Sequence, residues 1–149
     1  MRSSYRDVVD VLLEQHDEIR RLCAAVERSG GEEKARRFAA LVPALRLHER
    51  GEQSVVHPAT RDCAVAGHLI GTARVVEEQA IERSLEDLEY LGTGHPSFDH
   101  LFAALYRAVL DHMTREELDE FPLLRHYVPI QRLHMMAGEL RDVQLLDAA

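Results

Sequence analysis

The stretches HERGEQSVVHP at residues 48–58 and HMTREELDEFP at residues 112–122 share one spacing pattern. Each opens with a histidine, has a glutamate four residues later and reaches a proline ten residues after the histidine. Residues four apart lie on the same face of a helix, so each stretch presents an imidazole and a carboxylate to one side. The repetition is compatible with two αα-hairpins related by a pseudo-twofold axis.

Length and composition indicate one ordinary domain over residues 1–149, with 46% apolar and 30% charged residues. The net charge of −8 disfavours nucleic acid as a partner, because phosphate binding needs a basic surface. The sequence lacks the roughly 18 apolar residues that a membrane span needs, and the N-terminal MRSSYRDVVD lacks the apolar stretch of a secretory signal. We therefore expect a cytoplasmic protein without a membrane partner, as a monomer or weak homodimer. Cys23 and Cys63 are expected to be small buried residues and not a disulfide.

Apolar residues recur with a helical period in five segments, and none alternates with the period of a strand. The predicted helices span about residues 5–28, 32–56, 67–91, 96–122 and 129–146, with Pro43 inside the second and His57-Pro58 closing it. Short polar loops between the long helices predict an all-α, up-down-up-down four-helix bundle over about residues 5–122, followed by a short fifth C-terminal helix. The fifth helix carries an apolar stripe (Ile130, Leu133, Ala137 and Leu140) and is expected to fold back over its own bundle, although the stripe could also bind a partner.

Possible metal ligands interrupt the apolar stripe of each long predicted helix. From the first helix to the fourth, the stripes are Val9, Leu12, His16, Ile19 and Cys23; Phe38, Leu41, Leu45, His48, Glu52 and Val55; Val75, Glu78, Ile81, Glu82, Leu85 and Leu88; and Leu101, Leu105, Val109, His112 and Glu116. A buried carboxylate without a partner is unstable or shifts its pKa. Shared cations would remove that cost for all of these groups together. The candidate ligands are therefore His16, His48, Glu52, Glu78, Glu82, His112 and Glu116.

Each candidate has a simpler explanation when it is considered alone. An inward histidine such as His16 is often a hydrogen-bonded core residue, and histidine–glutamate pairs one turn apart also occur on helix surfaces. Glutamates 78 and 82 lie in a glutamate-rich segment, where most carboxylates are solvated. The coincidence on all four helices favours a metal cluster. His57 lies half a turn off the stripe of a straight helix and corresponds to Phe121 in the second stretch, so it is expected to pack, with ligation as the alternative.

The chain resembles hemerythrin-like proteins of the HHE cation-binding type over about residues 7–128. The resemblance rests on LLEQHDEI around His16, LRLHERGEQSVVHP around His48 and AVLDHMTREELDEFP around His112, in that order. It implies a four-helix bundle with two non-haem irons that are bridged by carboxylates and an oxo or hydroxo group. His16 and His48 would serve one iron, His112 and the third helix would serve the other, and Glu52 and Glu116 would bridge.

The third predicted helix departs from the family members that carry O2 reversibly, because it offers glutamates and no histidine in VVEEQAIERSLEDLE. Carboxylates are hard anionic donors that favour the higher oxidation state of iron. The expected function is therefore a di-iron oxidoreductase that reacts with O2, peroxide or nitric oxide, with no catalytic side chain assigned. A non-enzymatic carrier, store or sensor and a metal-free helical interaction domain are the alternatives. Manganese and zinc also suit these donors.

Overall fold

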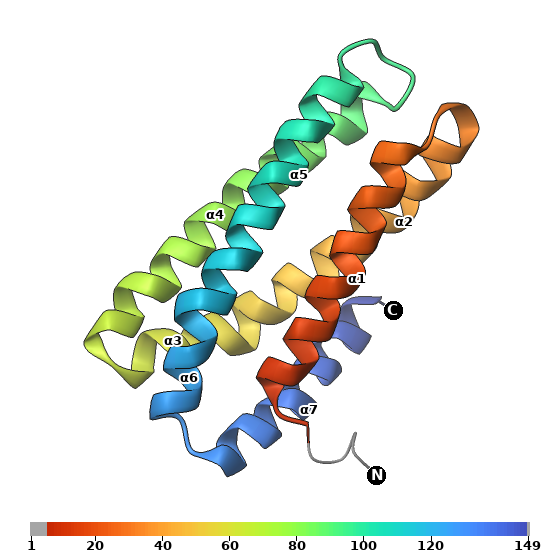
Figure 1. The fold of residues 1–149 in the computed structure, drawn as a ribbon. Coiled ribbons are helices and arrows are strands. Elements are labelled where there is room, and N and C mark those ends of the chain that lie inside the picture. Colours follow the sequence, from red (N-terminus) through yellow and green to blue (C-terminus); the bar gives the residue numbers. More distant parts are fainter. Residues whose placement is uncertain (1–5, 149) are drawn as a thin grey trace.

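The long helices of the computed structural model, which describes residues 6–148, run side by side as an antiparallel bundle (Figure 1). All regular elements of the described residues are helical, as predicted, and the fold is the expected up-down-up-down bundle with an additional C-terminal helix. The predicted start at Tyr5 lies outside the described residues. In chain order the elements are α1 (Val8–Arg28), α2 (Gly31–Gly51), η2 (Glu52–Val56), α3 (His57–Cys63), α4 (Val65–Leu91), α5 (Phe98–Arg115), η3 (Glu116–Glu120), α6 (Phe121–Tyr127) and α7 (Ile130–Ala148).

The second and fourth predicted helices do not end at their prolines, so these two predicted ends are wrong. Each continues through a π-helical segment, η2 or η3, and then through a further α-helix of seven residues. Pro58 and Pro122 lie in the first turn of α3 and α6. A proline inside an α-helix lacks a donor and its ring clashes with the carbonyl four residues earlier. A π-helical turn widens the helix just before the proline, which allows the chain to continue in the same direction.

Local signals place the helix ends that fix the bundle. Asp7 caps α1 in a capping box, in which its side chain accepts from the Asp10 N–H and the Asp10 carboxylate accepts from the Asp7 N–H. At the sharp corner between α3 and α4, a Cβ added to Gly67 would lie 2.0 Å from the Thr60 carbonyl oxygen. Glycine is therefore required where these two helices meet, and this contact fixes the direction in which α4 returns along the bundle.

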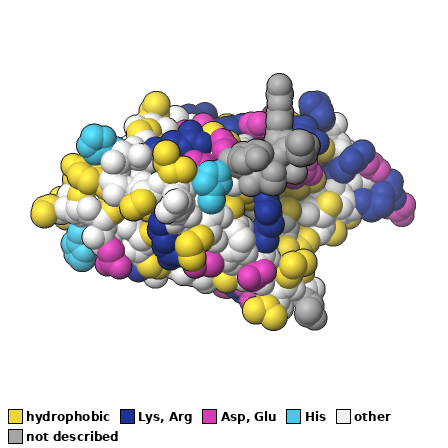
Figure 2. All heavy atoms as spheres, turned by 90° about the horizontal axis from the view of Figure 1, so that it is seen from below, with side chains coloured by type: hydrophobic (Ala, Val, Ile, Leu, Met, Phe, Trp, Pro, Cys, Tyr) yellow, Lys and Arg dark blue, Asp and Glu magenta, His cyan; other side chains and the backbone are white. Residues whose placement is uncertain are grey.

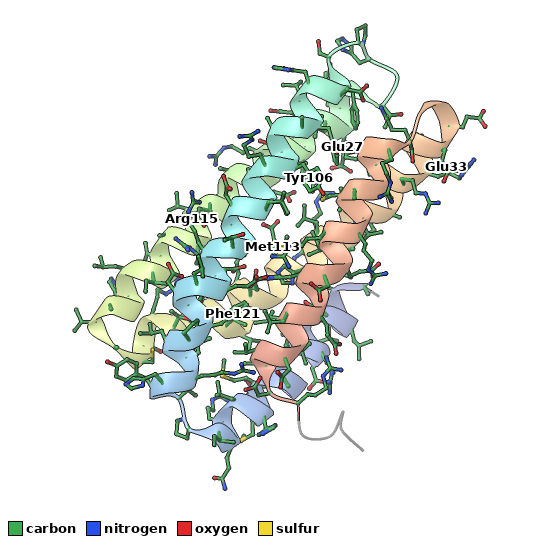
Figure 3. All side chains as sticks on the ribbon, viewed as in Figure 1. Glu27, Glu33, Tyr106, Met113, Arg115 and Phe121 are labelled. Atoms are coloured by element: carbon green, nitrogen blue, oxygen red, sulfur yellow. The ribbon has the colours of Figure 1, made fainter. Side chains whose placement is uncertain are left out.

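The apolar core consists of two clusters, one toward each end of the bundle. The first cluster includes Ile19, Cys23, Phe38, Leu41, Leu45, Ile81, Leu85, Leu88, Phe98, Phe102, Leu105, Val109 and Met113. The second includes Val8, Val9, Val11, Leu12, Val55, Val56, Phe121, Leu124, Leu133, Met136, Ala137 and Leu140. Figure 3 shows Met113 and Phe121 pointing into the bundle from α5 and α6. Candidate ligands of α1, of α2 with η2 and of α5 with η3 lie between the two clusters, so apolar packing shields them from water on both sides.

Helix α7 folds back and packs against α1 and α2, as predicted for the fifth helix (Figure 1). Leu133, Ala137 and Leu140 of its predicted stripe are buried, whereas Ile130 at its start is 73% exposed. Leu101 was likewise expected to face inward but is 43% exposed, because Phe98 and Phe102 occupy the inner face of α5. Cys23 is buried, as expected, whereas Cys63 is partly exposed, so the expectation of a buried residue is wrong there; both are free thiols.

The exposed apolar side chains are distributed over several helices. Among the described residues, no helix combines the length and the apolar character needed to cross a membrane. On the face shown in Figure 2, hydrophobic side chains are interspersed with acidic and basic ones.

Candidate metal centre

Six of the seven predicted ligands converge between the two core clusters. His16 comes from α1, His48 from α2, Glu52 from η2, Glu78 from α4, His112 from α5 and Glu116 from η3, and each of them is at most 2% exposed. The structure therefore brings together imidazoles and carboxylates from all four long helices of the bundle, as the stripe pattern predicts.

The donor atoms form three groups, of which two share two carboxylates and the third consists of His57, Glu116 and Glu120. The first group is His16, His48, Glu52 and Glu116, and the second is Glu52, Glu78, His112 and Glu116; within each group the possible ligand atoms lie within 4.8 Å of one another. Glu52 and Glu116 belong to both groups. This arrangement fits two neighbouring cation positions with Glu52 and Glu116 between them.

All histidines of the cluster are oriented by a hydrogen bond on the outer ring nitrogen. Nδ1 of His16, His48 and His112 lies 2.6, 2.8 and 2.8 Å from an oxygen of Glu117, Gln15 and Glu77, respectively. A hydrogen bond from Nδ1–H to such an acceptor leaves the Nε2 lone pair free, which is the usual arrangement of metal-binding histidines. Each Nε2 points toward the cluster carboxylates.

The atoms that face the two cation positions have no hydrogen-bond partner within the described residues. They are His16 Nε2, His48 Nε2, His112 Nε2, Glu78 Oε2 and both carboxylate oxygens of Glu52 and Glu116. The three Nε2 atoms lie 3.2, 3.0 and 3.3 Å from carboxylate oxygens, but without hydrogen-bond geometry. Buried polar atoms are almost always satisfied. This concentration of unsatisfied nitrogen and oxygen donors fits bound cations with mixed histidine and carboxylate ligands.

Burial and neighbouring charges shift the pKa values of the cluster residues. Burial raises the pKa of Glu52 to about 7, and the charge of Glu116 acts in the same direction. Burial likewise raises the pKa of Glu116 and lowers the pKa of His48. For His112, burial alone would lower the pKa, but Glu116 and the other nearby carboxylates raise it well above the usual range. Cations at this place would stabilise ionised carboxylates and neutral imidazoles together.

His57 makes polar contacts through both ring nitrogens, so the expected aromatic packing role is wrong. It is fully buried, its Nδ1 lies 2.7 Å from Glu120 Oε2, and its Nε2 lies 3.1 Å from Glu78 Oε1 and 3.7 Å from Glu116 Oε2. Thr60 donates a second hydrogen bond to Glu120. His57 therefore repeats the orientation of the other three histidines, with an outer acceptor on Nδ1 and with Nε2 facing the cluster.

The π-helical segment explains why the sequence pattern placed His57 on the wrong face. The backbone N–H of His57 bonds to the carbonyl of Glu52, five residues earlier. Residues five apart share a face in a π-helix, so His57 follows Glu52 into the cluster. In the second copy the same register brings Phe121 beneath Glu116, where its ring stacks on His16 with a centroid distance of 5.5 Å. Pro58 and Pro122, at the same place after the two motifs, were the only feature of the sequence that could have indicated this change of helix register.

Glu82 is the predicted ligand that the structure does not bring into the cluster. Its side chain is 38% exposed, and Arg46 Nε donates to it over 2.9 Å. Glu82 lies one turn beyond Glu78 on α4, at the outer side of the helix pair formed with α2. Its prediction as a ligand rested on the shared face with Glu78, but the cluster ends at Glu78.

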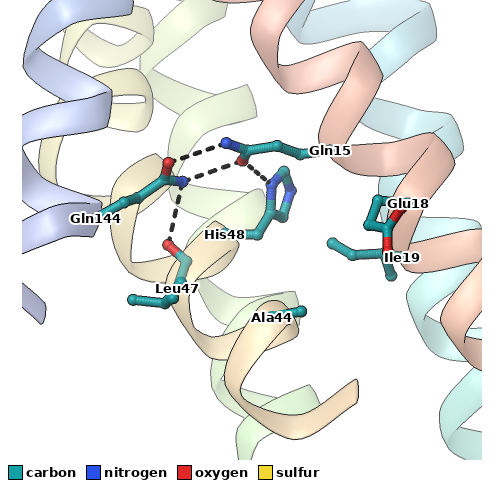
Figure 4. Close-up of a pocket in the computed structure, with 7 residues that line it drawn as sticks. All are labelled: Gln15, Glu18, Ile19, Ala44, Leu47, His48 and Gln144. Atoms are coloured by element: carbon teal, nitrogen blue, oxygen red, sulfur yellow. Dashed lines mark hydrogen bonds between the residues drawn. The ribbon is translucent and has the colours of Figure 1, made fainter. Parts of the chain in front are cut away.

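The C-terminal helix reaches the centre through a chain of amide hydrogen bonds. Gln144 of α7 and Gln15 of α1 donate to each other over 3.0 and 2.9 Å, and the Gln15 oxygen also lies 2.8 Å from His48 Nδ1 (Figure 4). These residues line a cavity of about 190 Å³ together with Ile19, Ala44 and Leu47. Helix α7 therefore contributes to the position of His48, although it follows the region that carries the histidine motifs.

A four-helix bundle that directs buried imidazoles and carboxylates from all four helices toward two adjacent points is a metal-binding bundle protein. The chain belongs to the hemerythrin HHE cation-binding domain family, whose model matches residues 7–124. This match confirms the resemblance drawn from the three histidine motifs.

Two individual proteins show how far the similarity extends. The crystal structure of a hemerythrin HHE cation-binding domain-containing protein from Mycobacterium kansasii superposes with a TM-score of 0.83, at 19% identity, over 95% of this chain and 86% of that one. This likeness supports the fold. A protein named DNA nickase from Nostoc sp. (strain PCC 7120) is 23% identical over 137 residues, which are 91% of this chain and 38% of the relative. The chain thus spans well under half of that protein.

Proposed function

We propose that the protein is a non-haem di-iron protein that reacts with O2, peroxide or nitric oxide. The observation that carries the proposal is the pair of donor groups that share Glu52 and Glu116, with unsatisfied atoms facing both cation positions. His16 and His48 would hold one iron, and Glu78 and His112 the other. Manganese and zinc are the competing metals, because the same donors suit them.

His57 is a further candidate ligand on the side of Glu78 and His112. Its Nε2 lies within 3.1 Å of Glu78 Oε1, and Glu120 holds its Nδ1 in the orientation that suits a ligand. This addition would give the second position more donors than the first. The shared carboxylates would keep the two cations close together.

Iron bound here would supply electrons and Lewis acidity to a small oxygen or nitrogen compound. The chain's own residues hold the donors in place and exclude water. Ile19, Leu45 and Val109 lie on the first-cluster side of the site, and Phe121 covers His16 on the other. Glu78 lies on the helix where reversible O2 carriers supply histidines, and this added carboxylate favours oxidation chemistry over reversible binding.

The competing function is non-enzymatic binding, as an oxygen carrier, iron store or sensor. Release of intact O2 on degassing of the reduced protein would favour it. The relative named DNA nickase shares a region that makes up only 38% of its own length, and the acidic charge of −8 disfavours contact with phosphate backbones. Nucleic acid is therefore not among the proposed substrates.

Metal analysis and rapid kinetics on the full chain test the proposal. We expect two iron ions per chain, an ultraviolet-visible band of a bridged ferric pair, and oxidation of the reduced protein within seconds of mixing with peroxide. The variant His112→Ala should lose one equivalent of iron. The control His100→Ala, at an exposed histidine of the same helix, should keep both. A metal content near zero would favour the metal-free interaction domain, and an inert loaded centre would overturn the proposed reactivity.

A further inference from the structure

A polar pocket between α2, η2 and α4 leads to the cluster from the protein surface. It has a volume of about 160 Å³ and is lined by Arg46, Glu49, Arg50, Gln53, Glu78 and Glu82. One wall carries Glu49 and Gln53, which are one helical turn apart on α2 and η2. The other wall carries Glu78 and Glu82, which are one turn apart on α4. The pocket therefore connects a half-exposed carboxylate, Glu82, with a buried candidate ligand, Glu78.

Glu49 is the unexplained residue of this pocket. It is 5% exposed, and its Oε2 atom is buried without a hydrogen-bond partner. It does not belong to any of the groups of cluster donors, although it directly follows His48 in the chain. A buried carboxylate without a partner is unfavourable, so its presence beside the pocket points to an occupant that pairs with it.

The charges around the pocket favour a cationic occupant. The guanidinium of Arg46 is engaged by Glu82 and Glu89, and Arg50 faces Asp147 at 3.7 Å. Both arginines therefore already have carboxylate partners within the chain. Glu49 has no basic partner among the described ion pairs. An anion would have to displace these partners and would meet the carboxylates of Glu49 and Glu78.

We propose that this pocket is the access site for divalent cations, in which Glu49 binds an incoming ion and passes it to Glu78. This inference rests on the proposed function, because it requires a centre that takes up cations. The volume of about 160 Å³ is enough for one partly hydrated ion. Gln53 donates to Glu78 Oε1 over 3.1 Å and keeps this carboxylate at the inner end of the pocket.

Uptake kinetics of the metal-free full chain test this access site. The protein is mixed with Fe²⁺ without oxygen, and the reaction is stopped at set times with a chelator that measures the remaining free ion. We expect Glu49→Gln to slow uptake about tenfold, since an amide cannot release a proton to become an anionic ligand of the incoming cation. Glu82→Gln should slow it less than Glu49→Gln does, because Glu82 already pairs with Arg46. Glu86→Gln removes the same charge from an exposed position of α4 outside the pocket and should leave the rate unchanged.

The final metal content separates this inference from the proposed function. If the native chain takes up no iron, the proposed di-iron function fails. If it fills normally and all three variants fill at the native rate, the access site is overturned while the centre stands. Loss of one iron at equilibrium in Glu49→Gln would also overturn it, because Glu49 would then be a ligand of the resident centre.

Anomalous scattering provides a second measurement that needs no variant. Crystals of the iron-loaded full chain soaked in Cd²⁺ should show a cadmium peak between Glu49 and Glu78. A soaked crystal with cadmium elsewhere and none in the pocket would overturn the inference, as would phosphate found on Arg46 and Arg50 in its place.

Discussion

Replacing Glu77 by glutamine should weaken one of the two cation positions while leaving the other intact. Glu77 Oε1 accepts from His112 Nδ1 over 2.8 Å, and Arg115 binds the other oxygen over 3.1 Å. Arg115 points from α5 toward this side of α4 in Figure 3. Burial alone would raise the pKa of Glu77, but the hydrogen bond from His112 and the charge of Arg74 lower it, so the residue is ionised. Glu77→Gln keeps the size and removes the charge.

The expected loss follows from the difference between two kinds of hydrogen bond. A bond to an ionised carboxylate is worth about 1–2 kcal/mol more than one to a neutral amide, which corresponds to a 5- to 30-fold weaker Kd for the cation held by His112. Gln15 already provides the neutral version of this contact at His48, over the same distance of 2.8 Å. The substitution therefore gives His112 a partner that the chain tolerates elsewhere.

Competition with a chelator of known affinity measures both equivalents of bound Zn²⁺. One equivalent should weaken in Glu77→Gln, and neither should change in the charge-matched control Glu86→Gln, which lies on the exposed side of α4. Two unchanged equivalents would refute the role given to Glu77. Equal weakening of both equivalents, with a lower melting temperature of the metal-free protein, would show a general loss of stability in place of a local effect.

Three further outcomes follow from the structure. Removal of metal should lower the melting temperature by on the order of 10 °C, measured by circular dichroism, because the buried donors lose their partners. Gly67→Ala should cost several kcal/mol in urea unfolding, since the new Cβ meets the Thr60 carbonyl at 2.0 Å, whereas Gly138→Ala, with open space at its Cβ, should stabilise the helix slightly. For Asp7, burial alone would raise the pKa, but the hydrogen bond from Arg125 lowers it. Asp7 therefore stabilises the fold at neutral pH, and the stability difference from Asp7→Asn, up to about 1 kcal/mol, should disappear as the pH falls below about 3.8.

The sequence pattern predicted the bundle and the convergence of the cluster because helical periodicity constrains both. His16 lies between Leu12 and Ile19 on α1, and His112 follows Val109 on α5, so an inward apolar neighbour determines the direction of each imidazole. The pattern did not distinguish Glu78 from Glu82, which share a face. Tertiary packing decides between them: α2 presents Arg46 to Glu82, and only Glu78 reaches the interior.

The helical pattern of the sequence could not predict the hydrogen-bond partners of the histidines. Glu77 and Glu117 each directly precede or follow a candidate ligand, but they orient a histidine on a different helix. Gln144 acts on His48 across more than ninety residues of sequence, through Gln15. Such contacts depend on the rotation of each helix in the bundle. A single sequence does not specify this rotation closely enough to assign them.

The two His-x-x-x-Glu stretches, at His48 and at His112, differ at the residue that follows the π-helical segment. This difference should give the two cation positions different ligands. His57 adds a nitrogen beside Glu78, whereas Phe121 stacks on His16 and adds an apolar wall. Mössbauer spectra of the iron-loaded protein should therefore show two distinct iron sites. His57→Phe, which makes the copies alike, should weaken only the iron held with Glu78, and His57→Gln should weaken it less because an amide can still bond to Glu120. A single iron signal in the native protein would contradict the inequality, and unchanged iron affinity in His57→Phe would remove His57 from the ligand set.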